Sequence, residues 1–277
     1  MNWELPADFS DRYGPWALIA GGSEGTGEAF ARRLAAEGIN LVLLARRQAP
    51  LDSLAADVRA EHNVEVRTAS VDLGDADAAS IAAELTEDLD IGLVIFNAGA
   101  TIRFNYFTDW PEEDLLALVN MNCRTTTLFA HRFAPRLIER GGGGFVLVGS
   151  VAGFAGSTHQ SVYNASKAYD WVFAEGLWRE LGIYGVDAIA MVIGATDTPS
   201  HRRMGADLSA HSPMDASDVA DEALANLRNG PTYVVGEHNR VASEFILTPH
   251  NRGAIVSSMS ESSASIAGDE MLPMVLK

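Results

Sequence analysis

The stretch SVAGFAGSTHQSVYNASK, residues 150–167, decides how the rest of the chain is interpreted. Tyr163 and Lys167 stand four residues apart at the start of a segment with helical apolar periodicity, so on a helix they share one face. Ser150 follows the apolar run FVLVG, a pattern that predicts a buried strand ending at this serine. Because the carboxyl ends of parallel strands border the ligand crevice, we expect the three side chains to meet there.

The use of lysine strengthens this interpretation. Lysine occurs only at Lys167 and Lys277, whereas arginine occurs eighteen times. A compact ammonium can approach a phenol more closely than a planar guanidinium can. A free tyrosine has a pKa near ~10, and an ammonium about 4 Å away supplies the roughly 4 kcal/mol needed to bring it close to neutrality. The trio therefore predicts proton transfer by Tyr163, with Ser150 orienting a substrate oxygen; the alternative is an inconsequential surface Tyr and Lys.

Length and charge limit the classes of protein to which the chain can belong. Its 277 residues suit one α/β domain, and its net charge of −17 argues against nucleic acid or an anionic membrane surface as a partner. The single Cys123 allows no intramolecular disulfide and fits a reducing compartment. The polar, acidic start predicts no signal peptide, and no run approaches the roughly 20 apolar residues of a membrane anchor. We expect a cytoplasmic protein.

A glycine-rich turn follows the first predicted strand, WALIA, residues 16–20. Gly21, Gly25 and Gly27 lie in this turn and at the start of an amphipathic helix. Glycines there let a pyrophosphate approach backbone N–H groups at the helix N-terminus, although such a turn can also be only a turn. The order of strand, glycines and helix favours a dinucleotide site.

Strand and helix patterns alternate along the chain and predict a parallel sheet. The fold class is therefore α/β, a three-layer doubly wound Rossmann fold with a mainly parallel seven-stranded sheet. We expect one domain over residues 1–277, with a substrate lid at about 199–216 and a Ser-rich, loosely patterned tail from about 237. The further predicted strands are at residues 40–44, 64–70, 92–96, 145–149, 187–193 and 232–236.

With these motifs in this order, roughly residues 14–236 resemble the short-chain dehydrogenase/reductase superfamily, in its compact single-domain branch. Within the family, residues 13–47 are most similar to the hydroxysteroid dehydrogenase and 3-oxoacyl-CoA reductase group. The resemblance implies an enzyme whose catalytic residues are Asn122, Ser150, Tyr163 and Lys167. It implies that Asn122 holds a water molecule that links Lys167 to solvent. Three positions depart from the family pattern, at Ala20, Phe96 and Ile193, and none of them removes a group that performs chemistry.

The resemblance also implies a nicotinamide cofactor. Ala45 stands where NAD-dependent relatives usually carry an acidic residue, and Arg46 can bind a ribose 2′-phosphate with help from Ser23. Glu24 counts against this, because NADP-preferring relatives often carry a basic residue there. We expect NADP(H) to be preferred, with NAD(H) still open, and no metal. The implied cofactor-binding residues are Gly21, Ser23, Gly25, Thr26, Gly27, Arg46, Arg47, Asp72, Leu73, Asn97, Ala98, Gly99, Tyr163, Lys167, Gly194, Thr196 and Thr198.

The expected substrate is a ketone or secondary alcohol, mainly apolar, of steroid, 3-oxoacyl or aryl ketone type. Residues after the predicted strands offer apolar walls, although several of them can equally be core. His201, Arg202 and Arg203 in the lid are interpreted as solvated charges rather than as contacts to an anionic group. The expected walls are Ile102, Phe104, Tyr106, Val151, Phe154 and Met204.

A homodimer or homotetramer is expected, because family members commonly pair through the helices that carry the Asn and the Tyr. Here the second helix contains Trp171, Phe173 and Trp178, whose alternative place is against the protomer's own sheet. Two other functions stay open. One is a catalytically silent dinucleotide-binding sensor or scaffold, and the other is a nucleotide-sugar epimerase or dehydratase, for which the chain leaves little room.

Overall fold

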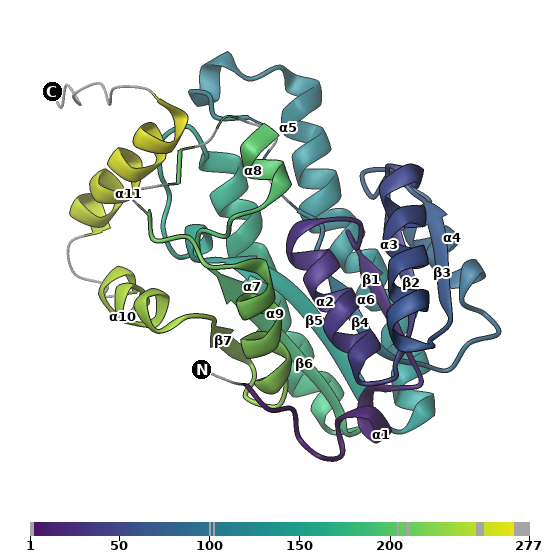
Figure 1. Ribbon diagram of the computed structural model, residues 1–277. Helices are drawn as coiled ribbons and strands as arrows, with labels where there is room; N and C mark the ends of the chain where they lie inside the picture. Colours follow the sequence, from purple (N-terminus) through teal and green to yellow (C-terminus); the bar gives the residue numbers. More distant parts are fainter. Residues whose placement is uncertain are drawn as a thin grey trace, which may run out of the picture.

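The computed structural model describes residues 3–99, 101, 103–203, 205, 207–208, 211–247 and 252–268. Seven strands form one sheet in the order β3-β2-β1-β4-β5-β6-β7, and every neighbouring pair is parallel (Figure 1). The predicted doubly wound seven-stranded sheet is confirmed. The strands are β1 (Trp16–Ala20), β2 (Asn40–Ala45), β3 (Val66–Ser70), β4 (Ile91–Phe96), β5 (Gly143–Ser150), β6 (Val186–Ile193) and β7 (Thr232–Val234).

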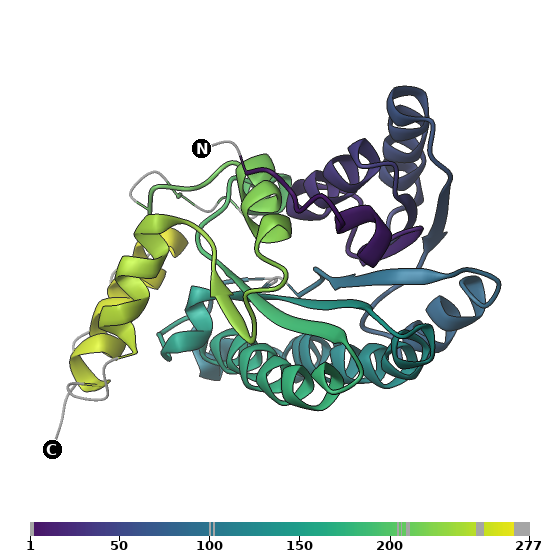
Figure 2. The same cartoon turned by 90° about the horizontal axis from the view of Figure 1, so that it is seen from below.

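Helices cover both faces of the sheet, and each face has its own apolar core. Figure 2 shows the purple helices α1 and α2 with the green α9 on one side, and the teal α6 and α7 on the other. Central strands such as β1 and β4 are buried along their whole length, as a sheet covered on both faces requires. The helices on the first side are α1 (Phe9–Tyr13), α2 (Gly25–Ala36), α3 (Gln48–His62) and α9 (Ala216–Ala225). Those on the second are α4 (Ala78–Leu85), α6 (Thr126–Arg140) and α7 (Ser161–Gly182).

The helical stretch between β4 and β5 is divided. It consists of α5 (Glu112–Val119), a π-helical segment η2 (Asn120–Thr125), and α6. Two short 3₁₀ segments follow β4 and β5 in the chain, η1 (Phe107–Asp109) and η3 (Val151–Phe154). Single π turns inside helices occur often at functional sites. The division places Asn122 in the irregular segment rather than in a regular helix.

Two segments that lack clear periodicity nevertheless contain helices. The expected lid begins with α8 (Pro199–Arg203), and the Ser-rich tail forms α10 (Glu237–Ile246) and α11 (Arg252–Ala267). Apolar periodicity predicts helices that pack one apolar face against a core, so it does not predict helices whose buried face is partly polar. The buried positions of α11 combine Ile255 and Ala264 with Ser260 and Ser263, and both serines bond to the loop before α7.

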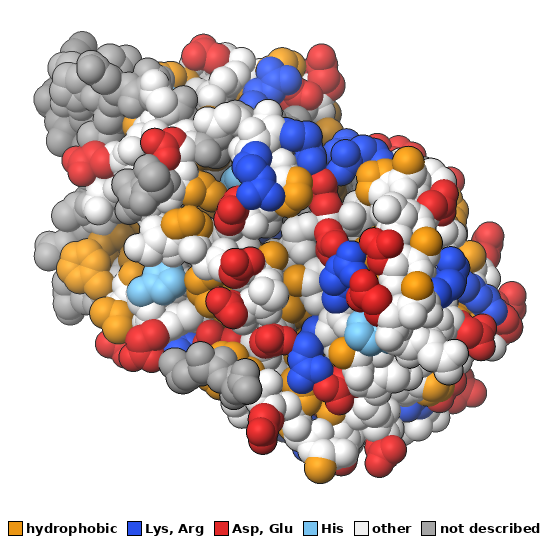
Figure 3. All heavy atoms as spheres, in the orientation of Figure 1, with side chains coloured by type: hydrophobic (Ala, Val, Ile, Leu, Met, Phe, Trp, Pro, Cys, Tyr) orange, Lys and Arg blue, Asp and Glu red, His pale blue; other side chains and the backbone are white. Residues whose placement is uncertain are grey.

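Charged side chains of both signs are interspersed on the face that Figure 3 shows, with acidic groups in the majority over the whole sequence. No helix in the described ranges is long and apolar enough to cross a lipid bilayer.

Candidate active site

Lys167 is the centre of the site. Its side chain is 4% exposed, and its Nζ donates to the carbonyl of Val148 on β5 at 2.9 Å and to Oδ2 of Asp170 at 3.0 Å. Gly99, at the end of β4, leaves room for this ammonium, because a Cβ there would lie 2.9 Å from Nζ. The strand ends of β4 and β5 and the first turns of α7 therefore meet at one buried cation.

Asn122 approaches the same point from η2. Its side chain is buried, and its Nδ2 donates to Ser166 Oγ at 2.8 Å, while Ser166 Oγ donates to the carbonyl of Tyr163 at 2.7 Å. Its Oδ1 has no hydrogen-bond partner within the described residues, and it would lie 3.0 Å from a Cβ on Gly99. Asn122 and Lys167 thus border the same small space, as expected for a pair that acts together.

Ser150 and Tyr163 complete the predicted set. Ser150 ends β5, and its Oγ accepts from the backbone N–H of Ala152 at 3.2 Å, which fixes the start of η3. Tyr163 lies in the first turn of α7 and is partly exposed, one turn before the buried Lys167. A partly exposed phenol beside a buried ammonium is a suitable group for passing a proton to or from a ligand.

Burial and charge act in opposite directions on this cluster. Burial disfavours the charge on Lys167, but Asp170 and then Tyr163 outweigh it, so the pKa of Lys167 is raised. Burial raises the pKa of the Asp170 carboxyl, and the neighbouring Lys167 offsets part of that rise. Burial, followed by the charge of Asp170, raises the pKa of the Cys123 thiol to about 11. The thiol therefore stays neutral near pH 7.

The glycine turn forms a cradle without side chains at the carboxyl end of β1. Gly21 and Gly25 have φ values of 88° and 58°, which favour glycine. A Cβ on Gly27 would lie 2.0 Å from the carbonyl oxygen of Gly21, so no larger residue fits there. Asn97, from the end of β4, donates through Nδ2 to the same carbonyl at 2.9 Å. The expected glycines and Asn97 are therefore brought together.

Glu24, between the glycines, is held by two arginines. Arg47 donates to its Oε2 at 2.6 Å, and Arg203 from α8 donates to the same oxygen at 2.8 Å and to Oε1. These contacts, with Arg203 first, keep the pKa of the Glu24 carboxyl low. Arg46 is exposed, and no side-chain partner is found for it in the described part of the chain. Of the two neighbouring arginines, Arg46, which is the expected phosphate ligand, is therefore the one that is available.

The remaining cofactor positions lie along the same edge of the sheet. Thr198, after β6, reaches the glycine turn, since a Cβ on Gly25 would be 3.0 Å from its methyl group. Asp72 is exposed after β3 and accepts the N–H of Gly74 at 2.9 Å, whereas Leu73 is buried in the core. The others stand in these same turns, namely Ser23, Thr26, Ala98, Gly194 and Thr196.

The expected substrate walls divide into two kinds. Phe104 and Tyr106 are half-buried in the loop after β4, and the ring of Tyr106 lies 4.4 Å from that of His159. Phe154 is 4% exposed and packs edge-on against Trp171, so most of it belongs to the core. Val151 is partly buried on the same core. Ile102 and Met204 lie outside the described residues.

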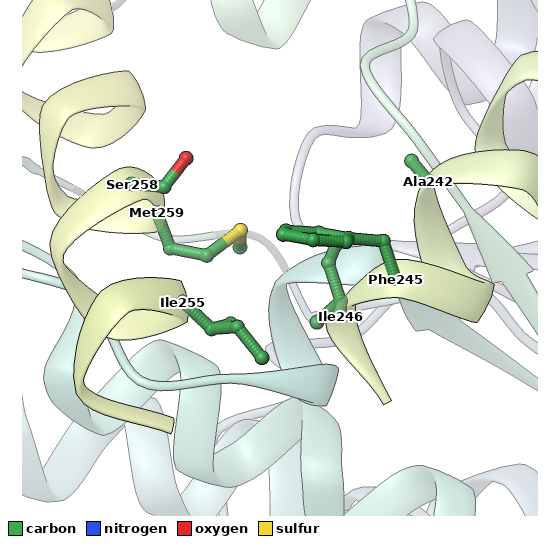
Figure 4. Close-up of a pocket in the computed structure, with 6 residues that line it drawn as sticks. All are labelled: Ala242, Phe245, Ile246, Ile255, Ser258 and Met259. Atoms are coloured by element: carbon green, nitrogen blue, oxygen red, sulfur yellow. The ribbon is translucent and has the colours of Figure 1, made fainter. Parts of the chain in front are cut away.

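The tail closes over the loop that joins β5 to α7. Ser260 on α11 accepts the N–H of Thr158 at 2.9 Å, and Ser263 donates to Ser157 Oγ at 2.9 Å. Figure 4 shows side chains of α10 and α11 facing one another across an apolar pocket of about 190 Å³. None of the four catalytic candidates lines this pocket, whose residues are Ala242, Phe245, Ile246, Ile255, Ser258 and Met259.

Asp170 is one of two residues of the site that the sequence motifs did not identify. A signal for it was present, because Tyr163, Lys167 and Asp170 follow one another at helical spacings of four and three and so share a face. Ser166 was also missed, although it joins Asn122 to the backbone of Tyr163.

Comparison with known proteins places this arrangement among oxidoreductases. Residues 15–209 match the model of a family described as short chain dehydrogenase. The chain is 30% identical over 236 residues to the 7beta-hydroxysteroid dehydrogenase of Clostridium sardiniense, an alignment that covers 84% of this chain and 90% of that protein.

Two solved structures are similar over most of their length. One, from work on the stereoselectivity of 7beta-hydroxysteroid dehydrogenase, has a TM-score of 0.83 at 27% identity and covers 90% of this chain and 97% of its own. The other is a short-chain dehydrogenase from Sphingobium yanoikuyae in complex with NADPH. Its TM-score is 0.77 at 34% identity, with 84% of this chain and 91% of its own covered.

Proposed function

The chain belongs to the short-chain dehydrogenase family, and on that premise we propose that it interconverts a ketone and a secondary alcohol with NADP(H), on a mainly apolar substrate, with Tyr163 as acid and base. The observation that carries the proposal is the buried Lys167 ammonium, fixed on the carbonyl of Val148 one helical turn after the partly exposed Tyr163. Such a cation stabilises the ionised phenol.

The described residues fit a nicotinamide dinucleotide. The glycine turn admits a diphosphate against backbone N–H groups at the start of α2, because Gly21, Gly25 and Gly27 carry no side chain there. The unpartnered Oδ1 of Asn122 and the ammonium of Lys167 border the space beside Gly99. A structural relative at 34% identity binds NADPH, which supports the same cofactor for this chain.

The proton chemistry falls to the chain's own residues, and the nicotinamide supplies or accepts the hydride when it is bound. Ser150 would orient the substrate oxygen, and Tyr163 would donate a proton to it in reduction or accept one in oxidation. Lys167 would hold the charge of the phenolate and bind ribose hydroxyls. Asn122 would support replacement of the proton through a water near Lys167.

A cofactor-consumption screen tests this proposal. Purified protein is incubated with NADPH and a panel of steroids, 3-oxoacyl thioesters, aryl ketones and sugars, and oxidation of the cofactor is followed optically. We expect bulky lipophilic ketones to be reduced fastest, because the half-buried Phe104 and Tyr106 present apolar surface near the site. Much faster reduction of small hydrophilic sugars would contradict the proposal of a mainly apolar substrate.

Arg46→Ala is expected to reduce the preference for NADP(H) over NAD(H) by roughly ten- to a hundredfold, the worth of one charge-assisted hydrogen bond to the 2′-phosphate. The exposed Arg46 is available for this contact, whereas Arg47 is bonded to Glu24. The measurement is kcat/KM with each cofactor. The matched control is Arg132→Ala, which removes an exposed arginine from α6 and should leave the ratio unchanged. A wild type that uses both cofactors equally would refute the role of Arg46.

We further propose that two protomers pair through exposed apolar side chains on α5 and α7. Leu116 and Val119 on α5 are 54% and 41% exposed, and Val172 and Trp178 on α7 are 61% and 43% exposed. Trp171 and Phe173, in contrast, pack on the protomer's own core. Their burial leaves Trp178 as the expected aromatic contact.

Light scattering at micromolar concentration is expected to give the mass of a dimer or tetramer. Val172→Glu places a charge in the proposed contact and should lower that mass. Val241→Glu introduces the same charge at an equally exposed valine on α10 and should have no effect. A wild-type mass of one protomer would exclude the pairing.

The alternative of a silent dinucleotide-binding sensor remains testable. Such a protein would bind NADPH yet oxidise none of it with any ketone of the panel. The presence of the complete set of Asn122, Ser150, Tyr163 and Lys167 favours turnover, because binding alone needs no group such as Tyr163 to transfer a proton.

A further inference from the structure

The Lys167 ammonium donates one hydrogen bond, to Asp170, that its proposed role does not require. An ammonium has three N–H donors, and two of them are used by the carbonyl of Val148 at 2.9 Å and the carboxylate of Asp170 at 3.0 Å. One donor therefore remains for Tyr163 and for ribose hydroxyls. Asp170, which accepts the second of these hydrogen bonds, therefore affects how Lys167 can act.

Asp170 is well placed to control this cation. Its side chain and that of Lys167 are each 4% exposed, so the attraction between them is little screened by water. Its second oxygen, Oδ1, has no hydrogen-bond partner in the described part of the chain. Asp170 is therefore bound to the site mainly through Lys167.

A gain in folding stability does not by itself explain why the protein buries this ion pair. Burying two charges costs about as much solvation energy as their attraction returns, so apolar residues of similar size often serve equally well. The carboxylate also reduces the positive charge that Tyr163 experiences. The pair as a whole is neutral, whereas Lys167 by itself would favour the phenolate more strongly.

We propose that Asp170 is a positioning residue for the reaction, an internal counter-ion that holds Lys167 against β5 and sets how strongly the ammonium favours ionised Tyr163. This inference rests on the proposed acid–base role of Tyr163. The titratable groups that face the pair are Tyr163 on α7 and the thiol of Cys123 on η2, while β5 contributes only the carbonyl of Val148.

The first test is the pH–rate profile of alcohol oxidation, measured with NADP⁺ and either a 7β-hydroxysteroid or a 1-arylethanol. Oxidation needs the phenolate, so Asp170→Asn should displace the half-maximal rate to lower pH by about one unit, because the charge of Lys167 is no longer balanced. Glu180→Gln removes the same charge from an exposed position on α7 and should leave the profile unchanged. An unchanged Asp170→Asn profile, or one moved to higher pH, would overturn the proposal.

A second measurement needs no activity. Lys167→Met leaves the Asp170 carboxylate buried without its partner and should lower the melting temperature by several degrees. Adding Asp170→Leu should recover most of that loss. Additive losses from the two changes would show that the residues do not act as a pair and would also overturn the inference.

The proposed function fails separately. If Tyr163→Phe stays active, the acid–base assignment is wrong whatever Asp170 does. If Tyr163→Phe is inactive while Asp170→Asn keeps the wild-type profile, only the counter-ion role is wrong.

Discussion

Tyr163→Phe is expected to lower kcat by about 10²- to 10⁴-fold, the usual contribution of general acid–base catalysis, while the affinity for NADPH changes little. The substitution removes one hydroxyl from a partly exposed ring in the first turn of α7. The backbone there is held independently, because the carbonyl of Tyr163 accepts from Ser166 Oγ at 2.7 Å. Loss of turnover would therefore report the proton and not a displaced helix.

Steady-state rates and NADPH fluorescence titrations check this expectation together. Tyr184→Phe is the matched control, since it removes the same hydroxyl from a tyrosine that is 51% exposed beyond the far end of α7. It should keep wild-type kcat. A Tyr163→Phe enzyme that retains more than about a tenth of wild-type kcat would show that another group transfers the proton.

Lys167→Arg is expected to lower kcat by about 10²-fold or more, although the positive charge is kept. The ammonium fits between the carbonyl of Val148, the carboxylate of Asp170 and the backbone of Gly99. A planar guanidinium is wider and donates in a fixed fork, so it cannot make the first two contacts and still lie beside Gly99.

The comparison with Lys167→Met separates charge from shape. If shape and donor geometry both matter, the Arg and Met variants should be similarly slow. Arg132→Lys exchanges the same two residue types at an exposed position on α6 and should leave kcat unchanged. Near wild-type kcat for Lys167→Arg would mean that any cation suffices at this place, and the geometric argument would be wrong.

The sheet and the location of the site could be predicted because both depend on local patterns. Apolar runs such as 16–20 and 145–149 end in glycine, serine or asparagine, and parallel strands bring those ends to one edge. Ser150, Asn97 and the glycine turn were placed at this edge by that rule alone. The Asn122 assignment depended instead on the family resemblance, because η2 has no distinct sequence signature.

Contacts between distant segments could not be predicted. Glu24 looked unfavourable for a phosphate, yet the fold supplies Arg203 from 179 residues further along to pair with it. Phe154 was expected as a pocket wall, but Trp171 covers it. Helix α11 was missed because its buried positions mix Ser260 and Ser263 with apolar residues such as Ile255, so its sequence shows no continuous apolar stripe.

The docking of α11 has a consequence for substitutions in this helix. The proposed catalytic groups stand on a strand end, on η2 and on α7, whereas α11 is attached to the loop before α7 through the hydroxyl groups of Ser260 and Ser263. Substitutions at the exposed positions of α11 are therefore expected to leave the seven-stranded sheet and its two apolar cores unchanged.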